Sequence, residues 1–183
     1  MEKRNNVIRE LKSWFFTVIL PVAIVVLVNL FVCKLAIVSG DSMYPTLHDR
    51  DLLLVWMLGA EPEQGDIIVA ETDADSRLHG DLVVKRMIAM EGQTVRIDYD
   101  ANLVYVDEVP LEEGYLNREE LDAMLPFFSE EPVVVPTGCI YVLGDNRNHS
   151  GDSRDPEIGM VPLEHLMGVS IARIPIGEWF PKS

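Results

Sequence analysis

Residues 82–90 read LVVKRMIAM, a run with clear β character. Apolar residues lie on both sides of a central Lys-Arg pair, and several of them are β-branched, which is typical of a strand. Because side chains alternate between the two faces of a strand, Val83, Lys85 and Met87 share one face. The stretch therefore predicts a strand in which the Lys85 side chain is flanked by apolar neighbours.

Further short β runs lie on either side of this strand, separated by turn residues, and no long helical stripe follows residue 33. A hairpin turn is expected over residues 98–103, since Asp and Asn stabilise turns by bonding their own backbone. The chain is therefore predicted to form a mostly β domain. Its predicted strands cover residues 52–57, 66–70, 82–90, 94–99, 103–106, 133–135, 139–143 and 167–174.

Residues 107–131 interrupt this pattern with nine acidic residues and one Arg. A short helix is predicted over residues 117–124, with Asn117 as its N-cap. Such a run of like charges is typical of a solvated surface excursion, and the sequence assigns it no function.

The chain is most apolar near its N-terminus. Residues 13–33 contain no charged side chain, and as a helix they would span about 31 Å, the thickness of a hydrocarbon core. Trp14 and Phe15 lie where an aromatic belt is expected, and a lone proline, Pro21, is tolerated in a membrane helix. The segment predicts one transmembrane helix. The alternative is a cleaved signal peptide, whose apolar region has only about 7–15 residues.

The charges before this segment predict its orientation. Four basic residues precede it, against two acidic ones. Because positive flanks stay on the cytoplasmic side, residues 1–12 are expected in the cytoplasm. Residues 34–183 then form the extracytoplasmic domain of a single-pass protein of the plasma membrane.

The charge balance excludes one large class of partner. The 183 residues include 15 Lys and Arg against 30 Asp and Glu, a formal net charge of −15, and nucleic-acid binding depends on clustered basic residues. Anionic lipids would also repel the acidic exported domain, so its contact with the membrane must be apolar. The two cysteines, Cys33 and Cys139, and four scattered histidines predict neither a disulfide framework nor a metal site.

The polar stretch at residues 39–47 contains a serine in a constrained setting. Pro45 restricts Tyr44 to extended geometry, close to Ser42. Ser42 follows Cys33 by nine residues, and a fully extended chain of that length reaches roughly 30 Å. Whatever Ser42 does therefore takes place near the membrane.

A serine hydroxyl is a weak nucleophile until a base removes its proton. A histidine could be that base, but none lies in a recognisable strand-end setting and no G-x-S-x-G motif is present. The other candidate is a neutral Lys85. Deprotonating a lysine of ordinary pKa costs roughly 4.6 kcal/mol at pH 7, and burial can lower the pKa by that much. The alternative is a lysine that extends from its strand into solvent.

Residues 144–154, which read GDNRNHSGDSR, bring many hydrogen-bonding side chains into a loop after a predicted strand. An ion pair between Asp152 and Arg154, and a hydroxyl from Ser150, are available there to hold a neighbouring lysine amine. The alternative is an ordinary cluster of turn residues.

Four segments, in this order, resemble the successive sequence boxes of bacterial type I signal peptidases, also called leader peptidases. The resemblance covers the apolar segment and nearly all of the exported domain, and the single apolar segment resembles the shorter branch of that family. The four segments are SMxPT at residues 42–46, GDIIV at 65–69, VKRMI at 84–88 and GDNRxxSxDSRxxxxGxV at 144–161.

The resemblance implies a membrane-bound serine endopeptidase of the Ser-Lys type, on a β-rich fold and without a cofactor. It would remove signal peptides from secretory preproteins at the lipid bilayer. Carried onto this chain, the resemblance makes Ser42 the nucleophile, Lys85 the general base and Ser150 the hydroxyl that orients the Lys85 amine. It also implies a structural ion pair between Asp152 and Arg154, in a loop supported by Asp145, Asn146 and Arg147.

This chain departs from some family members two residues before the nucleophile. They have a serine there whose hydroxyl helps the oxyanion hole, whereas this chain has Gly40. Backbone N–H groups, chiefly that of Ser42, are then expected to stabilise the oxyanion. Shallow pockets for small substrate side chains are expected to be lined by Met43, Ile68 and Val83, although each of these also fits a place in the core.

Two other classes of function also fit parts of the sequence. Non-catalytic relatives in pilus assembly, or chaperone-like ones, share the architecture but typically lack the nucleophile and the base, and both Ser42 and Lys85 are present here. Other Ser-Lys processing peptidases, such as self-cleaving repressors or conjugation-associated enzymes, are separated by the apolar segment and by the loop at 144–154.

Overall fold

The computed structural model describes residues 10, 13–73, 76–116 and 121–176, and antiparallel strands dominate it. The mostly β domain that the sequence predicts is confirmed. The helical elements are η1 (Phe15–Ile19), α2 (Leu20–Phe31) and η2 (Leu163–His165). The strands are β1 (Cys33–Ile37), β2 (Leu52–Trp56), β3 (Ile67–Glu71), β4 (Leu82–Met90), β5 (Thr94–Asp98), β6 (Leu103–Val106), β7 (Val109–Pro110), β8 (Val133–Val134), β9 (Cys139–Leu143), β10 (Val161–Pro162) and β11 (Leu166–Ile174).

The strands form two antiparallel sheets. The larger has seven strands in the order β1-β2-β11-β3-β4-β9-β10, and the smaller has four in the order β7-β6-β5-β8. In the large sheet β4 lies between β3 and β9, with Lys85 opposite Ile68 and Arg86 opposite Leu143. Strand β4 therefore lies inside the sheet and carries both Lys85 and Arg86.

The predicted strands agree closely with the observed ones. Strands β4, β6 and β9 have the predicted bounds, and the hairpin turn forms as expected, with the Ala101 N–H donating to Asp98 Oδ1 at 2.8 Å. Strands β1, β7 and β10 were not predicted from the sequence. Strands β7 and β10 have only two residues each, too few to show a period, and the apolar residues of β1 continue those of the preceding helix.

The core between the sheets is built from the inward faces of β4, β5, β6 and β9. Ile88, Ala89, Val104 and Leu143 are its most deeply buried members. A second cluster, which includes Met43, Leu47 and Val55, packs beneath β1 and β2. The second cluster matters for function because two of its members come from the turn that follows β1.

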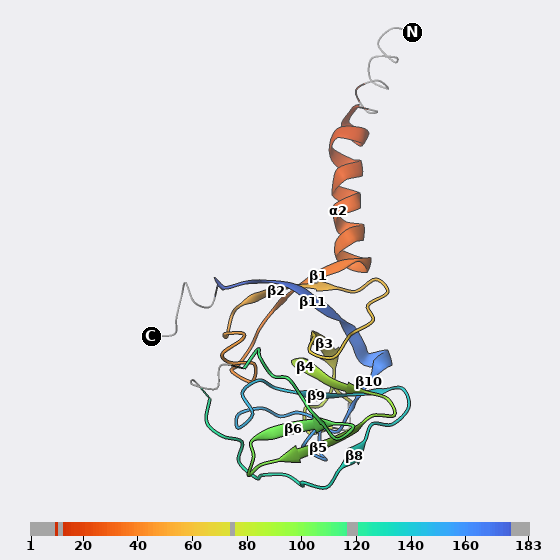
Figure 1. The fold of residues 1–183 in the computed structure, drawn as a ribbon. Coiled ribbons are helices and arrows are strands. Elements are labelled where there is room, and N and C mark those ends of the chain that lie inside the picture. Colours follow the sequence, from red (N-terminus) through yellow and green to blue (C-terminus); the bar gives the residue numbers. More distant parts are fainter. Residues whose placement is uncertain (1–9, 11–12, 74–75, 117–120, 177–183) are drawn as a thin grey trace, which may run out of the picture.

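Helix α2 stands away from the β domain, with β1 at its foot and β5, β6 and β8 at the opposite end (Figure 1). No helix in the described part of the chain combines the length and the apolar character that a bilayer crossing requires. The transmembrane helix over residues 13–33 therefore remains a prediction. Within that range, α2 ends at Phe31 and Cys33 already belongs to β1.

The helix predicted over residues 117–124 falls partly on residues 117–120, which lie outside the described residues. Residues 121–124 are not helical. Met124 is buried and its N–H donates to Asn102 Oδ1 at 2.9 Å, so contacts with the domain set the backbone path there rather than local helix propensity.

Candidate active site

Ser42 lies in the turn between β1 and β2. Its neighbours Met43 and Leu47 are buried in the cluster beneath β2, and the Leu47 N–H donates to the Met43 carbonyl at 2.9 Å. On the other side, the Asn146 N–H donates to the Ser42 carbonyl at 3.0 Å, and its side-chain amide donates to the Asp41 carbonyl at 3.1 Å. The turn is held from both sides, so the Ser42 hydroxyl has a defined position.

Lys85 reaches this hydroxyl from the middle of β4. Its Nζ lies 2.8 Å from Ser42 Oγ and 3.1 Å from the Val84 carbonyl oxygen. The side chain is almost completely buried, with 5% of the residue exposed. The alternative of a lysine extending into solvent is therefore excluded, and two residues 43 positions apart meet as the sequence analysis expected.

Burial lowers the pKa of Lys85 below its ordinary value of 10.5, because the charged ammonium loses its hydration. The negative charges of Asp152 and Asp145 act in the opposite direction and raise the pKa of Lys85, but burial is the larger effect. A lowered pKa increases the fraction of neutral amine, the form that can accept a proton from Ser42.

Asp145 and Asp152 each bind an arginine through two hydrogen bonds. Arg86 binds Asp145 through two contacts, Nε to Oδ1 at 2.8 Å and Nη2 to Oδ2 at 2.6 Å. Arg154 binds Asp152 in the same way, at 2.8 and 2.9 Å. All four side chains are buried, so each carboxylate depends on its arginine for compensation. The predicted Asp152–Arg154 pair is present.

Two groups in this network had no assigned role in the sequence analysis. Thr46 donates its hydroxyl to Asp145 Oδ2 at 2.5 Å, and Arg86 also donates to the Gly65 carbonyl at 2.6 Å. Arginine on an otherwise apolar strand is a signal that could have marked Arg86. Thr46 lies within a quoted motif, but its partner is 99 positions away, which no local pattern reveals.

Arg147 supports the loop after β9, as expected, but through an unexpected partner. Its Nε donates to the Gly144 carbonyl at 3.1 Å, and its Nη2 contacts Glu113 of the acidic segment. Both side chains are buried. The interpretation of the acidic segment as a solvated excursion is therefore wrong at Glu113, because a buried arginine draws this carboxylate into the interior.

Ser150 lies close to the dyad, but the expected bond to Lys85 is not made. Its Oγ is buried and has no hydrogen-bond partner among the described residues. A Cβ placed on Gly144 would lie 2.1 Å from Ser150 Oγ and 2.5 Å from the Ser42 carbonyl oxygen. Gly144 therefore permits the close approach of the Ser150 loop to the Ser42 turn.

A groove of about 250 Å³ opens beside Ser42 and Lys85. The expected pocket residues Met43 and Val83 line it, together with Ala36, Val38, Val69 and Met167 among others. Ile68 does not, because it has no exposed surface and packs in a core cluster with Ala70 and Met87. The core alternative for Ile68 is the one that the structure supports.

No cluster of three His, Cys, Asp or Glu side chains that could hold a metal ion occurs in the described ranges of the chain. Cys33 and Cys139 are both free thiols. Near Ser42, Asp145 and Asp152 are each paired with an arginine, whereas the Ser150 hydroxyl has no partner among the described residues.

The family model and the sequence relatives agree on one family. The sequence matches the family model described as signal peptidase, peptidase S26, over residues 11–175. "Signal peptidase I" of Bacillus licheniformis is 34% identical over 176 residues, which cover 92% of this chain and 91% of the relative. "Signal peptidase I S" of Bacillus subtilis (strain 168) is 33% identical over 180 residues, which cover 92% of each. A signal peptidase I of known structure, from Enterococcus faecalis V583, is 30% identical with a TM-score of 0.48, covering 60% of this chain and 96% of that one.

Proposed function

Since the chain belongs to the signal peptidase family, peptidase S26, it is a serine endopeptidase that removes signal peptides from secretory preproteins, and we propose that Ser42 and Lys85 carry out the cleavage. One observation carries this assignment: a buried amine lies 2.8 Å from the Ser42 hydroxyl oxygen. That distance is within reach for direct proton transfer.

The reaction proceeds in two acyl-transfer steps. Neutral Lys85 Nζ accepts the Ser42 proton as Oγ attacks the carbonyl carbon of the scissile bond. The C–N bond breaks and the protonated lysine returns its proton to the leaving amine. Water, deprotonated by Lys85, then attacks the acyl-enzyme, and the proton returns to Ser42 as the ester bond breaks.

The oxyanion is stabilised by backbone donors at Ser42. The Ser42 N–H donates to no acceptor in the part of the chain that the structure describes, whereas the Gly40 N–H donates to Asp49 Oδ1 at 2.8 Å. With glycine two residues before the nucleophile, no side-chain hydroxyl is available at that position. The Ser42 N–H is therefore the donor assigned to the oxyanion.

Ser150 is proposed to hold the Lys85 amine during turnover. The Ser150 hydroxyl is buried and has no partner among the described residues, so its oxygen can accept a hydrogen bond from a Lys85 N–H. Such a bond orients the amine and leaves its lone pair free for the Ser42 proton. The two Arg–carboxylate pairs serve a different purpose: they keep Asp145 and Asp152 from stabilising a protonated Lys85 more strongly.

The groove favours an extended substrate with small side chains. Strand β1 is the first strand of the large sheet, and β4 pairs with β9 only from Arg86 onward, so residues 82–85 of β4 have one edge that β9 does not cover. An extended peptide between these two edges forms backbone hydrogen bonds on both sides. The groove beneath is lined mostly by apolar side chains and is small, so we propose that it admits Ala-sized residues and excludes larger ones.

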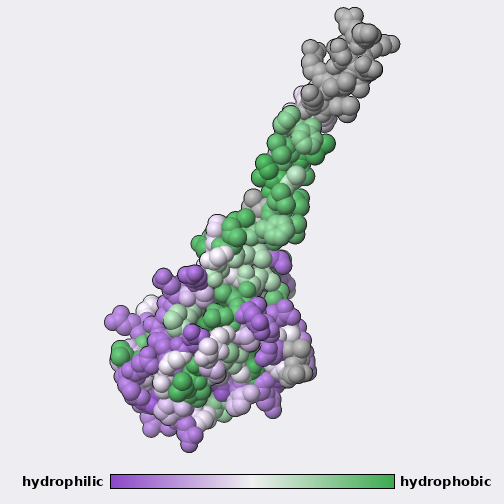
Figure 2. Space-filling view, turned by 90° about the vertical axis from the view of Figure 1, so that its right-hand side faces the viewer, coloured by the Kyte–Doolittle hydropathy of each residue, from purple (hydrophilic) through white to green (hydrophobic). Residues whose placement is uncertain are grey.

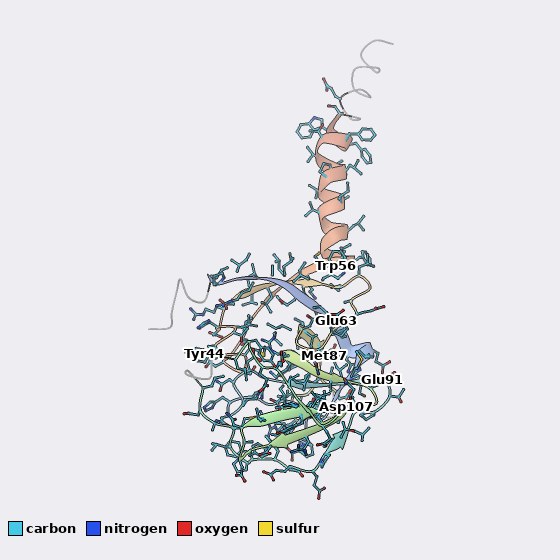
Figure 3. All side chains as sticks on the ribbon, viewed as in Figure 1. Tyr44, Trp56, Glu63, Met87, Glu91 and Asp107 are labelled. Atoms are coloured by element: carbon cyan, nitrogen blue, oxygen red, sulfur yellow. The ribbon has the colours of Figure 1, made fainter. Side chains whose placement is uncertain are left out.

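The enzyme is proposed to be anchored in the plasma membrane by residues 13–33, with residues 1–12 in the cytoplasm. Figure 2 shows the apolar surface of α2 continuing onto the adjoining end of the domain, and Figure 3 places Trp56 at the foot of the helix. Leu35, Ile37 and Leu58 are exposed in the same region. These side chains favour contact with the bilayer that does not depend on charge.

The test is cleavage of a Sec-type precursor by the purified full chain in detergent, with the cut mapped by mass spectrometry. Ser42→Ala and Lys85→Met should each lower turnover by about 10²- to 10⁴-fold, and the circular dichroism spectrum should stay native. Ser150→Ala should lower it less. The exposed serine variant Ser129→Ala is the control and should retain the wild-type rate. Turnover retained by either dyad variant would overturn the assignment.

A further inference from the structure

The acidic segment between β7 and β8 contacts the elements of the active site, and these contacts have no assigned role in the proposed reaction. We call residues 111–116 and 121–125 the strap. Although the strap is rich in acidic residues, Glu113 and Met124 are buried, whereas Glu112 is exposed. The strap lies against the two elements that carry the active site, β4 and the loop after β9, and touches each of them through named side chains.

The first contact joins Glu113 to Arg147. Both side chains are buried, and the same guanidinium donates to the Gly144 carbonyl at 3.1 Å and lies 3.5 Å from Met124 Sδ. Gly144 in turn lies directly against the Ser42 carbonyl and Ser150, since even a Cβ would not fit between them. A single side chain, Arg147, thus separates Glu113 from the backbone that contacts the nucleophile.

The second contact joins Tyr115 to Arg86. The Arg86 guanidinium lies 3.7 Å from the centre of the Tyr115 ring, within the range of a cation–π interaction. Tyr115 also donates its hydroxyl to Glu113 Oε1 at 3.4 Å. Arg86 follows Lys85 on β4 and binds Asp145, so the strap covers the arginine next to the proposed base.

The third contact clamps the C-terminal part of the strap. The side-chain amide of Asn148 donates to the Ala123 carbonyl and accepts from the Leu125 N–H, both at 2.9 Å. Asn148 belongs to the loop that also carries Arg147 and Ser150. The loop and the strap therefore hold each other through both a buried ion pair and a pair of amide hydrogen bonds.

We propose that Glu113 is a positioning residue for the Ser42–Lys85 dyad: through Arg147 it fixes the Gly144 backbone against Ser42, and with Tyr115 it makes the strap a second support of the active site. Glu113 touches no reacting atom. A buried guanidinium that lost this carboxylate would have to find water or another acceptor, and the loop backbone it holds would move with it. A displacement of about 1 Å at a reacting group can lower the rate about 10²-fold.

This inference rests on the proposed roles of Ser42 and Lys85, and the experiment separates the two. Precursor cleavage by the full chain in detergent is measured for Glu113→Gln, for the matched exposed variant Glu112→Gln and for Ser42→Ala. Rates are normalised to the folded fraction at a temperature well below unfolding. Glu113→Gln should lower kcat about 10²-fold and change KM less than about threefold, because orientation of the dyad is lost while the groove is intact. Glu112→Gln should match the wild type.

A double-mutant cycle tests the route of the effect. If Glu113 acts through Arg147, the variant with both Glu113→Gln and Arg147→Gln should have a kcat no lower than Arg147→Gln alone. Multiplicative losses would contradict this route. A wild-type kcat for Glu113→Gln, with Ser42→Ala inactive, would overturn the inference and leave the proposed function in place. An active Ser42→Ala would overturn the proposed function instead.

A second pair of variants covers the case in which Glu113→Gln does not fold. Tyr115→Phe keeps the ring over Arg86 and removes only the hydrogen bond to Glu113, so it should lower kcat less than Tyr115→Leu, which removes the ring and should change KM little. Equal kcat values for the two variants would contradict a positioning role for the strap.

Discussion

Lys85 is a residue whose chemistry depends on its surroundings. In water its amine is protonated at neutral pH, but here it is buried against Ser42 Oγ and the Val84 carbonyl. Burial lowers the pKa of Lys85, and the charges of Asp152 and Asp145 raise it. The pKa of Lys85 therefore depends on how well the two carboxylates are paired with their arginines. The same shift links catalysis and stability to pH.

The pKa of Lys85 makes a prediction with a definite sign. Turnover should fall as the pH drops through the lowered pKa, since the protonated amine cannot accept the Ser42 proton. In the unfolded chain the pKa of Lys85 is near 10.5, whereas in the folded protein it is lower. Between these two pKa values the unfolded chain binds a proton that the folded protein does not. Lys85 therefore destabilises the fold increasingly as the pH falls from 10.5 toward the folded-state pKa. Lys85→Met should therefore raise the unfolding temperature at pH 7, by less near pH 10, and the exposed Lys34→Met should not. A flat rate profile from pH 5 to 9 would contradict a lysine base.

The lack of a Cβ at Gly144 leads to a second prediction. A Cβ there would lie 2.1 Å from Ser150 Oγ and 2.5 Å from the Ser42 carbonyl oxygen, so the loop and the turn must separate. Gly144→Ala should lower the free energy of unfolding by about 1–3 kcal/mol and reduce turnover. Gly114→Ala, at a site with open space and no positive φ, is the matched control and should behave as the wild type in denaturant titration and cleavage assays. Wild-type turnover in Gly144→Ala would show that this close approach is not needed.

Strand β4 connects the parts of the active site because of its place in the large sheet. It presents Lys85 to the Ser42 turn and Arg86 to Asp145 in the loop after β9, and Thr46 of the turn donates to the same carboxylate. One strand, one turn and one loop are therefore joined by a single buried carboxylate.

Asp145→Asn tests this connection. Arg86 would lose its charged partner in the interior, which should lower the free energy of unfolding by about 3–5 kcal/mol. Because Asp145 raises the pKa of Lys85, its neutralisation should also move the acidic limb of the rate profile to lower pH. Both are measurable, by urea titration and by kcat against pH. Asp100→Asn, on the exposed hairpin turn, should change neither, and an unmoved or rising limb in Asp145→Asn would contradict the electrostatic argument.

The whole molecule is polarised along its length. Helix α2 and the exposed apolar side chains of β1 and β2 lie at one end, and the smaller sheet lies at the other (Figure 1). Ser42 comes from the turn that follows β1, the strand at the foot of the helix. With the proposed membrane anchor, enzyme and substrate would be confined to one surface, which would raise their effective concentration.

Membrane orientation gives the corresponding prediction. In a full-length background without cysteines, made by Cys33→Ser and Cys139→Ser, a thiol at the exposed Glu131→Cys should react with an impermeant maleimide added to intact cells. A thiol at Lys3→Cys should react only after the cells are permeabilised, because positively charged flanks stay in the cytoplasm. Labelling of both positions, or of neither, in intact cells would contradict the proposed single-pass topology.

Local sequence was sufficient for much of this protein. Short apolar runs bounded by turn residues predicted the long strands, and β4, β6 and β9 have the predicted bounds. Of these three strands, only β6 has side chains that alternate between buried and half-buried, whereas consecutive residues of β4 and β9 are buried. Ordered motifs also pointed to Ser42, Lys85 and the loop at 144–154, since each motif is contiguous in the chain. The Asp152–Arg154 pair is local as well, with its members two positions apart.

Contacts between distant segments could be established only from the folded chain. Sheet register and loop packing bring Glu113 to Arg147, Thr46 to Asp145 and Lys85 to Ser42, across 34 to 99 positions. The same packing buries Ile68 and leaves the Ser150 hydroxyl without a partner in the described part of the chain. The physical reason is that hydrophobic periodicity reports whether a side chain faces the core, whereas the identity of its neighbour depends on which strands pair and where the loops between them cross.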